Sequence, residues 1–159
     1  MRPHTAALPS NSSRKLVKQP YLPLLAATAF LLLVGVARAE PVFVKNAKNG
    51  VDGLTKADVK DYFLGKKKTF SNGTPVTVVL PAAGSPEMKW LCDGIIGASE
   101  ATVASKIKEQ IFKGEMKKPP VAASADECFA EAKKADGAIC VVDAAAKPPA
   151  GVAVLPVKD

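Results

Sequence analysis

The stretch PAAGSPEMKW, residues 81–90, combines residue types that can bind an anion through backbone groups. Gly84 and Ser85 stand where an apolar run gives way to a helical pattern. Free N–H groups at the start of a helix bind phosphate, sulfate or carboxylate, and a serine hydroxyl can add a further hydrogen bond. Ser followed by Pro is also an ordinary helix start, since Ser caps the helix and Pro fits its first position. The stretch therefore indicates either an anion site or a helix cap.

Three features of this stretch favour the helix cap. Pro86 has no N–H to donate, and Glu87 places a negative charge in the first turn of the helix. Residues 40–159 also contain no Arg, so the bidentate contact that Arg makes with phosphate is excluded there. Lys89, one turn further on, can still offer a positive charge. Ser85 is accordingly interpreted first as an N-cap, with anion binding as the competing hypothesis.

Residues 1–39 have the pattern of a secretory signal peptide. A basic segment comes first, with Arg2, Arg14, Lys15 and Lys18. An apolar run at 22–37 follows, and Ala-Arg-Ala at 37–39 fits a cleavage site. The apolar run is shorter than the roughly 20 residues that span a bilayer, which favours cleavage over an uncleaved anchor. We expect a periplasmic or secreted protein made of residues 40–159, forming one domain.

Cleavage after residue 39 would remove every His and Arg of the chain. The whole chain has 22 Lys and Arg against 15 Asp and Glu. Five of the basic residues and none of the acidic ones precede residue 40, so residues 40–159 carry 17 minus 15, or +2. This balance predicts no nucleic-acid partner. The absence of His and Arg excludes His-based metal sites and Ser–His or Cys–His catalytic pairs from residues 40–159, and we expect no cofactor.

The elements that must position these residues follow an α/β pattern. Strands are predicted at 41–46, 75–81, 138–143 and 152–157. Helices are predicted to begin after Thr55, Ser85, Ser99 and Ser124. Strand 75–81 is apolar throughout, which suits a sheet covered on both faces, and Pro156 favours an edge position for the last strand. The alternation predicts a single compact lobe, with a mixed sheet flanked by helices.

The three cysteines allow one internal bridge at most. Helix 125–135 and strand 138–143 run back on each other through a tight turn, so Cys128 and Cys140 both lie about 10 Å from that turn. A disulfide between them is one interpretation in an oxidising compartment. Two small buried apolar residues are the other. Cys92 lies on an apolar helix face and is expected in the core.

The succession of these signals resembles the phosphate-binding periplasmic proteins of ABC importers. The segment LTKADVKDYFLGKKKTFSNGTPVTVVLP resembles a helix that ends in an aromatic or Leu–Gly step, followed by a turn, a strand and a ligand-binding loop. The segment IKEQIFKGEMKKPPVAASADECFAEAKKADGAICVVD resembles a later part of the same lobe. The resemblance covers about residues 42–157. It implies one lobe of the type II periplasmic-binding-protein kind, whereas full members have two lobes that close on a ligand.

The resemblance implies an exported, non-enzymatic substrate-binding domain. Its ligand would be a small oxyanion such as phosphate, and its partner an ABC transporter or another exported protein. The stretch AAGSPEM takes the place of the family's phosphate loop, so the candidate ligand-binding residues are Gly84, Ser85, Thr55 and Lys89. The alternative is a protein-interaction module on the same fold that has lost its ligand. A hydrolase or redox enzyme is least supported, because residues 40–159 have no His base and no C-x-x-C pair.

Overall fold

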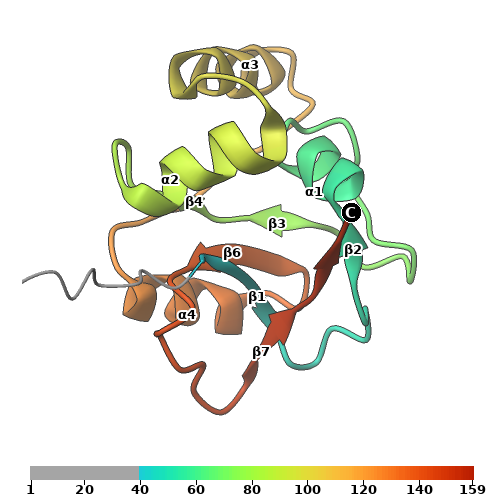
Figure 1. The fold of residues 1–159 in the computed structure, drawn as a ribbon. Coiled ribbons are helices and arrows are strands. Elements are labelled where there is room, and N and C mark those ends of the chain that lie inside the picture. The colour runs from blue at the N-terminus through green and yellow to red at the C-terminus, as the bar shows by residue number, and fades with distance from the viewer. Residues whose placement is uncertain (1–39) are drawn as a thin grey trace, which may run out of the picture. The chain divides into compact units, whose positions relative to one another are not determined.

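A four-stranded mixed sheet lies at the centre of the computed structural model, which describes residues 40–159 (Figure 1). The predicted signal peptide lies outside the described residues. The strands are β3 (Thr77–Val78), β6 (Ala138–Val142), β1 (Val42–Asn46) and β7 (Val152–Leu155), in that spatial order. β1 is antiparallel to both β6 and β7, whereas β3 is parallel to β6. The predicted fold class, a mixed sheet flanked by helices, is confirmed.

Two short parallel pairs form separate two-stranded sheets. β4 (Leu80–Pro81) pairs with β5 (Val121–Ala122), and β2 (Leu54–Thr55) pairs with β8 (Val157–Lys158). Neither β2 nor β5 was predicted as a strand, because two residues are too few to show an alternating pattern.

The predicted strand at 75–81 is divided between two partners. The Val79 N–H donates to the Ile139 carbonyl oxygen in β6 at 2.9 Å. The next N–H, that of Leu80, points to the opposite side and donates to the Pro120 carbonyl oxygen at 2.9 Å. Successive backbone groups of a strand point in opposite directions, so a single extended segment forms β3 on one side and β4 on the other.

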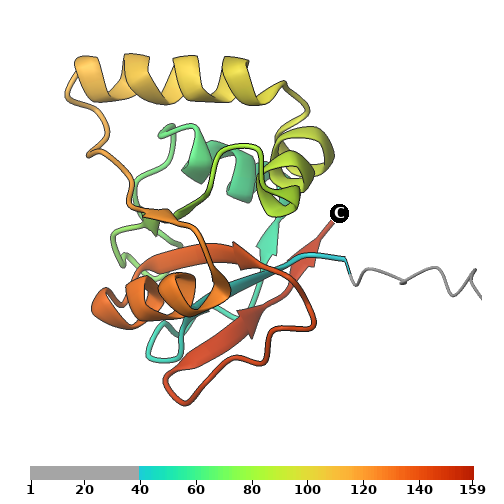
Figure 2. The ribbon, with the colours of Figure 1, turned by 90° about the vertical axis from the view of Figure 1, so that its left-hand side faces the viewer.

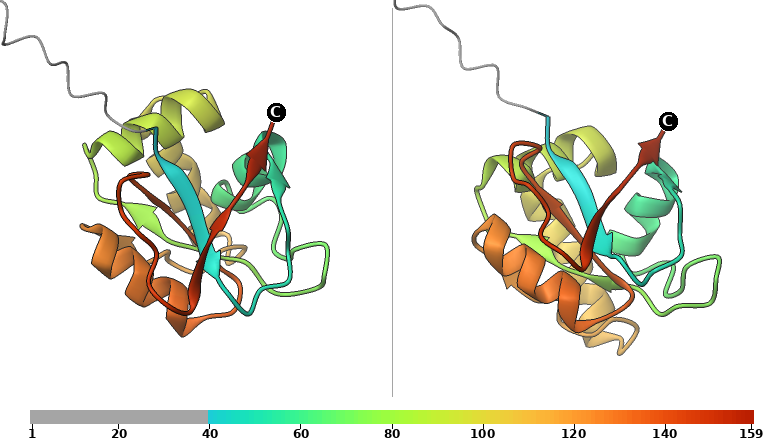
Figure 3. Two further views of the ribbon diagram at one scale, coloured as in Figure 1. Left: turned by 60° about the horizontal axis from the view of Figure 1, so that its bottom comes forward. Right: turned by 90° about the horizontal axis from the view of Figure 1, so that it is seen from below.

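The predicted strand at 152–157 is also divided, here by Pro156. Proline has no N–H to give to a ladder, but its carbonyl oxygen accepts from the Leu54 N–H at 3.0 Å. β7 lies at the edge of the sheet beside β1, as Figure 3 shows from below. The predicted edge position is therefore confirmed.

Every helix begins at its predicted cap. The helices are α1 (Lys56–Phe63), α2 (Pro86–Trp90), α3 (Glu100–Phe112) and α4 (Ala125–Lys134), and α2 continues as the π-helix η1 (Leu91–Ile96). Thr55 and Asp58 form a complete capping box at α1. At α4 the S-x-x-E pattern of Ser124 and Glu127 predicts a capping box, but only half of it forms, because the Glu127 carboxylate accepts from the Ala123 N–H instead of the Ser124 N–H.

The helices cover both faces of the sheet, as the two ribbon views show (Figures 1 and 2). α4 lies against one face, α1 and α2 lie against the other, and α3 lies outermost on the α1 side. Neighbouring residues of β6 accordingly belong to different cores: Ile139 packs with the α1 side, whereas Cys140 packs with the α4 side. All five residues of β6 are buried. This alternation shows a sheet covered on both faces.

The cysteines lie in these two cores. Cys128 of α4 and Cys140 of β6 are joined by a disulfide, with their Cα atoms 6.0 Å apart. Cys92 is a free, buried thiol on the other side of the sheet, in the core where it was expected. Within residues 40–159, no helix combines the length and hydropathy that a membrane span needs.

Candidate functional site

A pocket of about 100 Å³ lies where β4, β5 and β6 end and where α2 and α4 begin. We call it the serine-capped pocket; its polar lining residues are Ser85, Glu87, Ser124 and Asp143. β4 runs parallel to β5, and β3, which leads directly into β4, runs parallel to β6. The carboxyl ends of the three strands therefore meet at one edge. In open α/β sheets, ligands bind at that edge.

The two serines are positioned by the helices that they cap. The Ser85 Oγ accepts from the Met88 N–H at 3.0 Å, and the Ser124 Oγ accepts from the Glu127 N–H at 3.3 Å. Each hydroxyl retains its own hydrogen, which can be donated to a ligand. Two helix N-termini and two hydroxyl donors thus border one small pocket, an arrangement that suits hydrogen-bond acceptors such as oxyanions.

The predicted backbone donor at Gly84 has an internal partner. Its N–H donates to both carboxylate oxygens of Glu100, the first residue of α3, at 3.1 and 3.2 Å. The Ser85 N–H donates to the Ala82 carbonyl oxygen at 3.1 Å. Gly84 adopts φ +74° and does not line the serine-capped pocket. The turn therefore does bind a carboxylate, but that carboxylate comes from the chain itself.

The remaining two candidate residues lie away from this pocket. Thr55 caps α1 and lines a different hollow of about 240 Å³, together with Asp52, Asp58 and Lys158. Its hydroxyl donates to the Asp58 carboxylate at 2.7 Å. Lys89 is exposed and is not part of the serine-capped lining. Of the four sequence-predicted residues, the structure brings only Ser85 to the pocket.

The charge of the pocket is negative. Glu87 and Asp143 contribute carboxylates to the lining, and no Lys contributes to it. The Asp143 Oδ1 accepts from the Ala145 N–H at 2.8 Å. A fully deprotonated anion would be repelled by these groups, whereas an oxyanion that retains a proton can donate it to a carboxylate. No group of three His, Cys, Asp or Glu suited to a metal ion is present in the described part of the chain.

Ser124 and Asp143 were not among the predicted site residues. The S-x-x-E pattern marks Ser124 as a helix start, and Asp143 ends an apolar strand, so both had a sequence signal. What the sequence did not show was their nearness to Ser85. For Ser124 that nearness depends on the pairing of β4 with β5, which has only two residues. For Asp143 it depends on the parallel pairing of β3 with β6, which joins segments distant in the chain.

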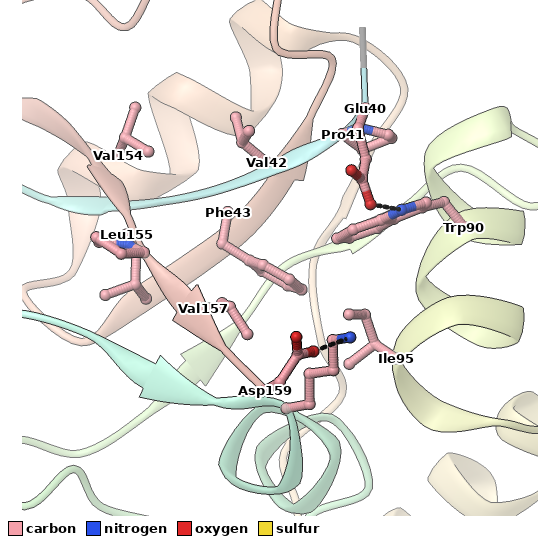
Figure 4. Close-up of a pocket in the computed structure, with 12 residues that line it drawn as sticks. Glu40, Pro41, Val42, Phe43, Trp90, Ile95, Val154, Leu155, Val157 and Asp159 are labelled. Atoms are coloured by element: carbon pink, nitrogen blue, oxygen red, sulfur yellow. Dashed lines mark hydrogen bonds and ion pairs between the residues drawn. The ribbon is translucent and has the colours of Figure 1, made fainter.

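A second hollow, of about 340 Å³, lies between β1, β7 and α2 (Figure 4). Its polar groups are already paired with one another. The Trp90 Nε1–H donates to Glu40 at 3.2 Å, and Lys56 forms an ion pair with Asp159. The Phe43 ring lies 5.5 Å from the Trp90 ring, between centroids. This hollow is less suited to a polar ligand than the serine-capped pocket.

Comparison with known proteins identifies relatives by fold alone. No protein-family model matches the sequence, and no curated protein matches it. The solved structures that are similar include three phosphate transport proteins. A protein from Clostridium perfringens, described as a phosphate ABC transporter substrate-binding protein and solved with bound phosphate, has TM-score 0.57 and 16% identity over 74% of this chain and 44% of its own. An ABC-type phosphate transport receptor from Vibrio cholerae has TM-score 0.56 and 13% identity over 74% and 46%. PstS from Borrelia burgdorferi has TM-score 0.52 and 11% identity over 75% and 47%.

The matched region covers less than half the length of each of these three proteins. Residues 40–159 have the fold seen in transport binding proteins. At identities as low as these, the likeness shows the fold and does not identify a ligand.

Proposed function

We propose that this chain is an exported, non-enzymatic substrate-binding domain of the phosphate-importer type, and that the serine-capped pocket holds a small oxyanion such as hydrogen phosphate. One observation carries the proposal: two serine-capped helices begin at one pocket, at the carboxyl ends of three strands. Helix N-termini and strand ends of this kind are where α/β folds bind anionic ligands. The fold likeness to three phosphate transport proteins supports the same assignment.

The lining of the pocket favours a ligand that both accepts and donates hydrogen bonds. Ser85 and Ser124 have hydroxyl hydrogens to donate, whereas Glu87 and Asp143 can only accept while ionised. Hydrogen phosphate retains a proton near neutral pH, and sulfate does not. The volume of about 100 Å³ corresponds to roughly three water molecules, which suits a small oxyanion and excludes a drug-sized ligand.

Replacing both serines by Asp tests the site. Asp caps a helix as well as Ser does, so the double variant Ser85→Asp/Ser124→Asp should fold, but its added carboxylates should repel the ligand. Phosphate at about 100 times its Kd should stabilise the unaltered residues 40–159 by about 2.7 kcal/mol, and the double variant should show no such stabilisation. Thermal unfolding with and without phosphate measures the stabilisation of the unaltered protein and of the double variant.

Ser99→Asp provides the matched control. Ser99 caps α3 in the same way, through the Thr102 N–H, but it does not line the serine-capped pocket. This variant should retain the whole response to phosphate. An unchanged response in the double variant would place phosphate elsewhere and refute the assignment of the site.

The second candidate function is a protein-interaction module on the same fold. It is favoured by the acidic lining of the serine-capped pocket and by the Gly84 N–H, which already donates to Glu100. Its partner would be a transporter component or another exported protein. A stable dimer or a copurifying partner, together with no response to phosphate, would support this function over the first.

Export is a prediction from the signal-peptide pattern of residues 1–39. The expected product begins at Glu40, immediately after the predicted cleavage site. Mass spectrometry of the protein recovered from the exported fraction measures its N-terminus. An intact chain retained at the membrane would contradict cleavage.

A further inference from the structure

A groove of about 710 Å³ lies between the lysine-rich turn at 66–68 and the linker at 114–120. We call it the lysine groove. Its charged lining residues are Lys67, Lys68, Lys117, Lys118 and a single acid, Glu115. It has no lining residue in common with the serine-capped pocket. Its volume is several times that of the serine-capped pocket, so a single small oxyanion would leave most of it empty.

Three of the four lysines have no anionic partner within residues 40–159. Lys67 is held by Asp58, at 2.7 Å, and by Asp61, at 3.7 Å. Lys68, Lys117 and Lys118 are exposed, and no ion pair to them is found among the described residues. Like charges gathered around one hollow create a positive potential that attracts acidic groups.

The groove also offers apolar surface. Pro75, Val76 and Met116 are among its lining residues and are at least partly exposed. Phe112, at the end of α3, lies two residues before Gly114, which lines the groove, and its side chain is 94% exposed. An exposed aromatic residue beside a polar rim is typical of the anchor positions in protein interfaces.

We infer that the lysine groove is a docking site for an acidic, extended segment of a partner protein. Carboxylates of that segment pair with Lys68, Lys117 and Lys118, and an apolar side chain packs against Phe112. The charge complementarity commits the site to an acidic occupant, and the exposed aromatic residue favours a protein segment over a simple polyanion. This inference does not depend on phosphate binding.

The probe is a short fluorescein-labelled peptide of glutamates with one central phenylalanine, titrated with residues 40–159. This segment has its own cores and forms one compact unit. We expect saturable binding by fluorescence anisotropy, weakened as salt is raised. The triple variant Lys68→Glu/Lys117→Glu/Lys118→Glu should weaken binding by roughly tenfold or more, because three attractive contacts become repulsive. Phe112→Ala should weaken binding of this peptide but not of one in which alanine replaces the phenylalanine.

The matched control is Lys48→Glu/Lys108→Glu/Lys147→Glu, which changes the net charge equally at three exposed residues outside the groove. It should bind the peptide almost as the unaltered protein does. Equal losses in the two triple variants would show a general charge effect and overturn the inference. Absence of peptide binding would overturn it too, as would binding only to vesicles of anionic phospholipid, which would make the groove a membrane-contact surface.

Discussion

At the residue scale, the N–H of Gly84, a candidate donor to a ligand, is already bonded to a side chain of the protein itself. The Gly84 N–H donates to both oxygens of Glu100, which stands sixteen positions later in the chain. The sequence favoured a helix cap at this turn, with an anion site as the competing hypothesis; Ser85 does cap α2, and the structure also places a carboxylate at the turn. The distance along the chain explains why the partner could not be predicted, since no local pattern links a turn residue to the start of a later helix. Ser85, which lines the serine-capped pocket, is therefore the residue of this turn that can contact a ligand.

Asp58 gives a pH-dependent prediction. The ammonium of Lys67 and the hydroxyl of Thr55 donate hydrogen bonds that lower the pKa of the Asp58 carboxyl in the folded protein. Because the folded-state pKa is the lower one, this stabilisation is complete above the unfolded-state value near 4 and is lost as the pH falls through the folded-state pKa. Asp58→Ala should therefore lower the free energy of unfolding by about 1 kcal/mol at neutral pH, the usual contribution of a helix cap. The difference between variant and unaltered protein should shrink in strong acid.

Urea unfolding of both proteins at neutral and acidic pH measures that difference. Lys108→Ala, which alters an exposed residue that forms no ion pair within residues 40–159, is a suitable control and should have little effect at either pH. A pH-independent loss in Asp58→Ala would show that the carboxylate charge is not what stabilises the start of α1.

The thiols give a second residue-scale prediction. Burial raises the pKa of the Cys92 thiol, and the nearby carboxylates of Glu100 and Asp93 add to this effect. The neutral thiol is the unreactive form, so Cys92 should resist thiol reagents in the folded protein at pH 8. With Cys128 and Cys140 joined, unfolding without a reductant should expose one reactive thiol, and unfolding with a reductant should expose three.

A thiol titration with a coloured disulfide reagent, in buffer and in denaturant, counts these groups. Reduction of the bridge should also lower the stability of the protein by about 2–4 kcal/mol, since it removes a constraint on the unfolded chain. Three reactive thiols in denaturant without reductant would show that the bridge does not form.

At the scale of elements, helix starts were predictable and strand ends were not. A helix cap is a local event, so Thr55, Ser85, Ser99 and Ser124 could be assigned from their neighbours in the sequence. Strand limits depend on partners that are distant in the chain. The segment at 75–81 therefore looked continuous, although it changes partner between Val79 and Leu80. The π-helical form of η1 has no evident cause in the sequence.

Gly137 tests the close approach that fixes β3 against β6. A Cβ atom added at Gly137 would lie 1.7 Å from the Pro75 carbonyl oxygen, which is backbone and cannot simply rotate away. Gly137→Ala should therefore destabilise the protein by about 1–3 kcal/mol, the range found for overpacked sites. Denaturant unfolding measures the change.

Gly50→Ala is the matched control for that substitution. A Cβ atom at Gly50 would meet nothing within 4 Å, and its φ is not in the left-handed region. This variant should be neutral or more stable by about 0.4–1 kcal/mol, because Ala restricts the unfolded chain. Similar effects of the two substitutions would mean that β3 and β6 are not packed as closely as the structure shows.

At the scale of the whole molecule, the architecture followed from the order of the elements. The α/β alternation, the two-sided burial and the edge position of β7 were all expected from apolar runs, caps and prolines. The site was only partly predictable, because Ser124 reaches Ser85 through the short β4–β5 pairing and Asp143 reaches it through the β3–β6 pairing. The matched region covers less than half of the phosphate transport proteins that share the fold.

Calorimetric titration of residues 40–159 with phosphate, with sulfate as the comparison ligand, tests the central claim most directly. The measurement is made at low salt and near neutral pH, where hydrogen phosphate is abundant. We predict saturable binding of phosphate and much weaker binding of sulfate, because Glu87 and Asp143 can accept a hydrogen bond from the P–OH group that hydrogen phosphate has and sulfate lacks. No heat and no stabilisation by phosphate would contradict the oxyanion assignment, and equal binding of both anions would contradict the role given to the two carboxylates.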